Sequence, residues 1–187
     1  MVGLILYTLY KGNSYLLLAN YVEAENTWAG FTGNGEWTQG DEALDSAIRN
    51  AVGQSRCYFS FAELRRSVES VHFQQPWENP THVSYFARVP RIESQVLEDD
   101  ERPCPEATAM SKKRPRLRWV PWNALRADIK LEAATPDAEP VRLVSSARHF
   151  PGMRGEHFLS PEFTGTMRRM LAVSERKDST MEFTLPW

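Results

Sequence analysis

A helical stripe in the segment from Asp41 to Val52 constrains the fold of this chain more than any other feature. Its apolar residues stand at 43, 44, 47, 48, 51 and 52, which is the spacing of one face of an α-helix. Acidic residues fill its first turn, where the helix dipole stabilises negative charge. Gly53 follows the stripe and predicts its end. We therefore expect an amphipathic helix over 41–52.

Two apolar runs precede this helix. The runs Val2–Tyr10 and Tyr15–Ala19 enclose the turn-forming residues 11–14 and predict a β-hairpin with a Gly-Asn turn. Trp28–Phe31 predicts a short strand. The three glycines in Thr32–Gly40 predict a loop between that strand and the helix.

Further elements are expected downstream. Ser60 is placed to cap a second helix over Phe61–Glu69, with Glu63 completing a capping box. Ser160-Pro161 predicts the start of a last helix that ends at Met170 or Ala172. Between them, the patterns predict strands at 71–73, 82–89, 117–120 and 141–144, loops at 98–116 and 135–140, and a helical turn at 122–125. Mixed strands with helices on both faces predict an α/β sandwich.

Composition limits the domain organisation and the partners. The chain has 187 residues, 42% of them hydrophobic, and a net charge of −2. This predicts one domain over residues 1–172 and a tail over 173–187. The low net charge gives no general attraction for polyanions, so a nucleic-acid partner is not expected. Residues 112–118 include five basic side chains, which we interpret as a solvated loop neutralised by the acidic run Glu98–Glu101.

The chain carries no recognisable membrane or export signal. Its longest apolar run falls far short of the roughly 20 residues that span a bilayer. Met1–Tyr10 has no basic start and no small-residue cleavage site, so it predicts a strand. Cys57 and Cys104 lack the spacing of a zinc site or a redox pair and predict reduced thiols, with a disulfide as the alternative. We expect a soluble cytoplasmic protein.

Residues 35–54 resemble the Nudix box, G-x5-E-x7-R-E-U-x-E-E-x-G-U, in which U is an apolar residue. Gly35, Gly40 and Arg49 stand where the family has Gly, Gly and Arg, and Asp41 replaces the first Glu while keeping a carboxylate. The hairpin before the box and the later stretch Arg118–Leu125 also resemble the family. The resemblance implies a Nudix-type α/β/α sandwich with a mixed β-sheet.

The resemblance also implies a reaction, and this sequence departs from its requirements. Nudix enzymes split a diphosphate joined to another group, with Mg²⁺ or Mn²⁺ held by glutamates on one helical face. Here Asn50, Gly53 and Gln54 replace three of those glutamates, so we assign no catalytic residue. We expect no cofactor, and Mg²⁺ or Mn²⁺ only if the protein is active.

A few acids remain near the altered box. Glu36 in the glycine loop and Asp41 are weak candidates for metal ligands. The acidic run Glu98–Glu101, or Glu106, is a further source of ligands from a loop. Asp45 is instead expected to form an i, i+4 ion pair with Arg49.

The glycine loop also offers candidates for ligand binding. Trp28 and Trp37 flank it, and together with Glu36 they are the residues that we expect to contact a nucleotide-like ligand. The alternative for the tryptophans is packing in the core and at its rim. The four histidines share no metal-binding spacing and are interpreted as packed or surface residues.

Three functions remain open at this point. The first is a non-catalytic protein on a Nudix fold that binds a nucleotide-like ligand or serves as a scaffold. The second is a metal-dependent hydrolase of nucleoside diphosphate-linked substrates that uses relocated acids. The third is a structural subunit of a homo-oligomer. A fold does not by itself determine a function, so the choice rests on the residues of the box. The loss of its acids favours the first function.

Overall fold

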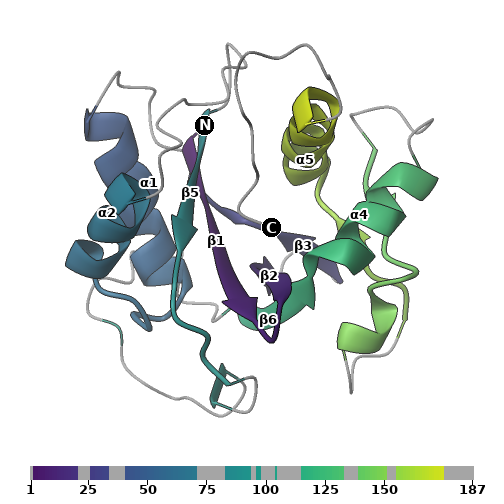
Figure 1. Cartoon of the computed structure of the whole chain (residues 1–187), viewed down its shortest axis with the longest axis horizontal. Helices are drawn as coiled ribbons and strands as arrows, with labels where there is room; N and C mark the ends of the chain where they lie inside the picture. Colours follow the sequence, from purple (N-terminus) through teal and green to yellow (C-terminus); the bar gives the residue numbers. More distant parts are fainter. Residues whose placement is uncertain are drawn as a thin grey trace.

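The protein has a mixed α/β fold (Figure 1). The computed structural model describes residues 2–20, 26–33, 41–70, 83–93, 96–97, 104, 115–132, 139–150 and 155–174. The α-helices in these ranges are α1 (Asp41–Gln54), α2 (Phe61–Ser70), α4 (Trp122–Leu131) and α5 (Pro161–Ser174). The strands are β1 (Val2–Tyr10), β2 (Asn13–Asn20), β3 (Thr27–Ala29), β4 (Phe31–Gly33), β5 (Val83–Arg88), β6 (Arg116–Pro121), β7 (Val141–Arg142) and β8 (Phe158–Leu159).

The β1–β2 hairpin is the centre of the sheet. Lys11 and Gly12 form its turn, with φ angles of 50° and 75°, as a type I′ turn requires at both central residues. The predicted hairpin is confirmed, although its turn is Lys11-Gly12 and Asn13 already belongs to β2. Each hairpin strand has three partners: β1 pairs with β2, β4 and β5, and β2 pairs with β1, β3 and β6.

The sheet mixes parallel and antiparallel pairs. β1 and β5 run parallel, as do β3 and β8, while the remaining pairs are antiparallel. Alternate residues of the hairpin strands face opposite sides, so each strand contributes to two separate apolar cores. Leu4 and Leu6 face one core and Ile5 and Tyr7 face the other.

Helices cover both faces of the sheet (Figure 1). On one face, α1 buries its predicted stripe of Ala43, Ala47, Ile48, Ala51 and Val52 against β1 and β4, and α2 packs beside it. On the other face, α4 and α5 enclose a second core with Trp28 and Phe150. The α/β class predicted from the element order is confirmed.

Local sequence signals also predicted where two helices begin. The Ser60 backbone N–H donates to Glu63 Oε2 at 2.8 Å, and the Glu63 N–H donates to Ser60 Oγ at 3.3 Å. This is the expected capping box of α2, and the hydrogen bonds from Ser60 lower the pKa of Glu63. The helix predicted to open at Ser160-Pro161 is confirmed as α5 and continues to Ser174.

Three predicted elements needed correction. The strand expected over 141–144 is shorter, because β7 covers only Val141–Arg142. The strand expected over Trp28–Phe31 is split into β3 and β4 at Gly30, where an added Cβ would lie 2.9 Å from Phe163 Cε2. The helical turn expected over 122–125 is the ten-residue helix α4, whose far end is buried through Asp128 and Ile129. The strand expected at 71–73 lies outside the described residues.

The far end of α4 is attached to the rest of the fold through the side chain of Asp128. Its carboxylate is fully buried and accepts three backbone N–H groups, from Val144 at 3.2 Å, Ser145 at 2.6 Å and Ser146 at 3.0 Å. Such hydrogen bonds compensate a buried charge for its lost hydration. α4 is thereby attached to the segment that follows β7.

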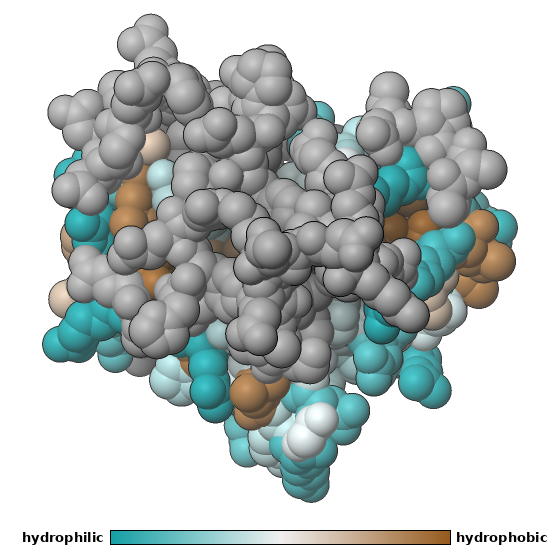
Figure 2. Space-filling model, turned by 45° about the horizontal axis from the view of Figure 1, so that its top comes forward, coloured by the Kyte–Doolittle hydropathy of each residue, from teal (hydrophilic) through white to brown (hydrophobic). Residues whose placement is uncertain are grey.

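The surface view shows apolar residues in small groups separated by hydrophilic ones (Figure 2). Among the described residues, the exposed large hydrophobic side chains are spread along the chain: Leu9, Tyr10, Val96, Leu131 and Val144. Among the described helices, none is long and apolar enough to cross a membrane.

Candidate functional site

The C-terminal end of α1 closes with a Schellman motif. The Cys57 N–H donates to Val52 O at 2.8 Å and the Arg56 N–H donates to Gly53 O at 3.1 Å. This arrangement requires a left-handed residue at position 56, and Arg56 has a φ of 56°. Glycine is the usual residue there, and position 56 is also where the resemblance places the last glycine of the box.

The last two turns of α1 carry amides where the resemblance expects acids. Gly53 is buried, and Asn50 and Gln54 are half-buried. Among the residues that the structure describes, no group of three or more His, Cys, Asp or Glu side chains is arranged to hold a metal ion. Neutral amides and a glycine offer little to a hard divalent cation, which binds best to several charged oxygen ligands.

Two charged residues in the middle of α1, Asp45 and Arg49, contact α2. Asp45 Oδ1 accepts a hydrogen bond from Arg65 Nη1 at 2.7 Å, and both side chains are about one-third exposed or less. The expected Asp45–Arg49 pair is therefore corrected: α2 brings a better-placed guanidinium to Asp45. Arg49 lies over the ring of Phe61, 5.9 Å from its centroid.

Arg56 joins the end of α1 to a distant part of the chain. Its Nη1 donates to Leu97 O at 3.2 Å and its Nη2 donates to Pro115 O at 2.6 Å. Tyr58 adds a third contact, because its hydroxyl donates to Val96 O at 2.6 Å. One short turn thus binds the chain on both sides of residues 98–114.

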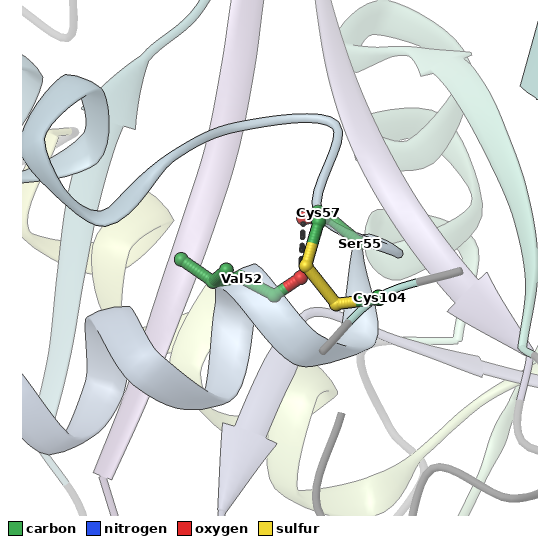
Figure 3. The surroundings of a disulfide bond; sticks show 4 residues. All are labelled: Val52, Ser55, Cys57 and Cys104. Carbon is green, nitrogen blue, oxygen red and sulfur yellow. Dashed lines mark hydrogen bonds between the residues drawn. A yellow bond between two sulfur atoms is a disulfide. The ribbon is translucent and has the colours of Figure 1, made fainter. Parts of the chain in front are cut away.

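A disulfide adds a covalent link at the same turn. Cys57 is bonded to Cys104, with a Cα–Cα distance of 5.4 Å, and Ser55 Oγ donates to Val52 O beside it (Figure 3). The expectation of two reduced thiols was wrong. Their separation of 47 residues hid the pairing, because only the fold brings the two side chains together.

Trp28 lies in the core. Its ring is fully buried, its centroid lies 4.5 Å from that of Phe150, and Nε1 donates to His157 Nδ1 at 3.4 Å. It therefore offers no exposed face to a base in this structure. Burial lowers the pKa of His157, which keeps the ring neutral and its Nδ1 available as an acceptor.

The other predicted site residues are placed only in part. Gly35, Glu36, Trp37 and Gly40 lie outside the described residues, as do the acids at 98–101 and 106. Asp41 is the first residue of α1. Arg49, Asn50, Gly53 and Gln54 belong to the same helix, as the register requires.

Sequence reasoning missed the roles of Arg56, Cys57 and Asp128. Arg56 carried a usable signal, since an arginine at the expected glycine position calls for a compensating contact.

Comparison with known proteins found no relative of this chain. No family model, no curated protein and no solved structure matches it.

Proposed function

We propose that this chain is a Nudix-type α/β/α domain that binds a nucleotide-like ligand without hydrolysing it. Three features support the Nudix register. The predicted helix forms over the box residues, it packs on a hairpin-centred mixed sheet, and its cap needs a left-handed residue at the position of the last box glycine. All three agree with one alignment of residues 35–56.

We infer the absence of hydrolysis from the C-terminal end of α1, which has no acidic side chain at the three positions where the box has glutamates. Asn50, Gly53 and Gln54 supply no carboxylate to a metal, and Mg²⁺ or Mn²⁺ is what would neutralise a diphosphate and activate water. The upstream acids do not replace them. Asp45 is paired with Arg65, and Asp41 starts the helix roughly 13 Å away from Asn50 along its axis, at 1.5 Å per residue.

The candidate ligand-binding residues of this proposal remain those of the glycine loop. Glu36 and Trp37 belong, by sequence, to the segment between β4 and α1. Asn50 and Gln54 add half-buried amides from α1 itself. Amides can donate to phosphate oxygens as neutral partners, which suits binding without metal-assisted cleavage.

The experiment is a combined binding and hydrolysis panel of nucleotides and sugar diphosphates, with and without Mn²⁺. We expect at least one compound to raise the melting temperature without Mn²⁺, and no compound to be cleaved. Robust Mg²⁺-dependent turnover that Glu36→Gln abolishes would refute the proposal. So would the failure of every compound to stabilise the protein.

A variant that restores acids sharpens the test. The double substitution N50E/Q54E adds two carboxylates to α1, and N50A/Q54A is the matched control because it removes the amides without adding charge. We expect Mn²⁺ to stabilise the first variant by a few degrees, and to leave the wild type and the control unchanged. Equal stabilisation of all three proteins would show that the wild type already holds the ion.

One observation favours a second candidate, a hydrolase with relocated ligands. The disulfide holds Cys104 beside Cys57 at the end of α1, and Glu106 follows Cys104 by two residues in the sequence. An acid near Cys104 is thus a source of a metal ligand for this end of the helix. Loss of Mn²⁺-dependent turnover in Glu106→Gln, with turnover retained in Glu139→Gln, would establish this candidate.

A further inference from the structure

A pocket lies at the turn of the β1–β2 hairpin, on the face of the sheet that α4 covers. Its volume is about 360 Å³, which falls within the roughly 300–1,000 Å³ of small-molecule sites. Seven residues line it: Leu9, Gly12, Asn13, Ser14, Trp122, Asn123 and Arg126. α1 packs on the opposite face of the sheet, so this pocket is separate from the box helix. An inference about the pocket therefore does not depend on the proposed function.

The beginning of α4 forms one wall. The helix starts at Trp122 after Pro121, and no side chain caps its N-terminus. Its first backbone N–H groups have no acceptor within the helix, and they carry the positive end of the helix dipole. Trp122 and Asn123, the first two residues of the helix, both line the pocket.

Ser14 lines the pocket from the side of the hairpin. Its side chain projects to the same face as Leu16 and Leu18, which is the face covered by α4. Only 8% of its surface is exposed, and none of the hydrogen bonds found in the described part of the chain uses its hydroxyl. Because the side chain lines the pocket and no described protein group pairs with it, its hydroxyl is available to hydrogen-bond a group bound there.

Among the described residues that line the pocket, one is charged. Arg126 adds its guanidinium one turn after the start of α4. Leu9 and Trp122 provide apolar surface in the same cavity.

We propose that this pocket binds a small organic anion, a carboxylate or phosphate joined to an apolar body. The anionic group accepts hydrogen bonds from the N-terminal backbone of α4, from Ser14 and from Arg126. The apolar body packs on Leu9 and Trp122. The size of the pocket and its mixed polar and apolar lining suit a ligand of this kind better than a free inorganic ion.

Benzoate, phenyl phosphate, benzamide and inorganic phosphate are the probes, titrated into the full chain by calorimetry. We expect saturable binding of benzoate or phenyl phosphate. The tighter binder of the two identifies the preferred anionic group as a carboxylate or a phosphate. Benzamide, which has the same ring and no charge, is expected to bind about tenfold more weakly. Equal binding of benzamide, or no binding of either aromatic anion, would overturn the proposal. Inorganic phosphate that binds as tightly as phenyl phosphate would also overturn it, because the apolar wall would then contribute nothing.

Variants locate the binding. Arg126→Gln and Ser14→Ala are each expected to weaken the aromatic anion about three- to tenfold, because each removes one donor to the anionic group. Arg66→Gln, an exposed position on α2 across the sheet, is the matched control and should leave affinity unchanged. Amide chemical shifts provide a readout that does not depend on variant folding. Ligand-induced shifts at Ser14 and Asn123 support the site, and shifts confined to α1 contradict it.

Discussion

At the scale of single residues, Arg56 shows a conflict between local and distant preferences. Its φ of 56° favours glycine, and a non-glycine residue in this conformation costs about 1 kcal/mol. Its guanidinium offsets this cost with hydrogen bonds to Leu97 O and Pro115 O. Hydrogen bonds from charged donors contribute roughly 1.5–3 kcal/mol each, so the contacts outweigh the strain.

We predict that Arg56→Gly destabilises the protein by about 1–3 kcal/mol, although it relieves the backbone. Urea denaturation measures this change. Arg49→Ala is the control for loss of an exposed arginine from α1, because alanine adds no helix penalty. A more stable Arg56→Gly protein would show that the two carbonyl contacts contribute less than the strain.

His157 gives a second prediction at this scale. Burial lowers its pKa, so the folded state favours the neutral ring, and Nδ1 accepts from Trp28 Nε1. The unfolded state then binds the proton more readily. The stability due to this ring is fully present above its ordinary pKa of 6.5, and it is lost as pH falls below that value towards the lowered folded pKa.

We therefore expect the melting temperature to fall between about pH 7.5 and about pH 5, and to fall less in His157→Gln, which cannot titrate. His149, whose pKa is also lowered by burial, is the comparison, through His149→Gln. An identical pH dependence in the wild type and His157→Gln would contradict the assignment.

At the scale of elements, the turn after α1 determines how a long connection is held. Ser55 and Arg56 close the helix, Cys57 forms a disulfide with Cys104, and Tyr58 contacts Val96 O. The Schellman motif aims these side chains, because two successive left-handed residues turn the chain back over the helix end. α1 therefore serves both as core packing and as the anchor for the connection between β5 and β6.

We predict that Cys104→Ser lowers the free energy of unfolding by up to about 4 kcal/mol, the chain-entropy value for a link across 47 residues. Chemical denaturation without reductant measures this. Adding reductant should lower the wild type to the level of Cys104→Ser and leave the variant unaffected. A wild type that does not respond to complete reduction would contradict this role of the disulfide.

At the scale of the whole molecule, the sheet separates two cores and two candidate sites. α1 and α2 cover the core that carries the box helix, and α4 and α5 cover the core beside the hairpin pocket. The three-partner strands β1 and β2 join both halves. Changes at Arg56 and Arg126 should consequently have additive effects on the free energy of unfolding, because the two residues lie in or next to elements on opposite faces of the sheet.

The sequence by itself determined the elements whose signals are local. The stripe of α1, the capping box of Ser60 and Glu63, and the β1–β2 hairpin depend on residues a few positions apart, so the sequence pattern alone predicts them. The exact turn, Lys11-Gly12, was not among these predictions. The acid-free end of α1 is likewise a property of the sequence. Tertiary structure alone decided the rest: the Cys57–Cys104 link, the pairing of Asp45 with Arg65, the burial of Trp28, and the short strands β7 and β8. Each of these joins residues far apart in the chain, and such contacts gain their energy only after the sheet has brought the partners together.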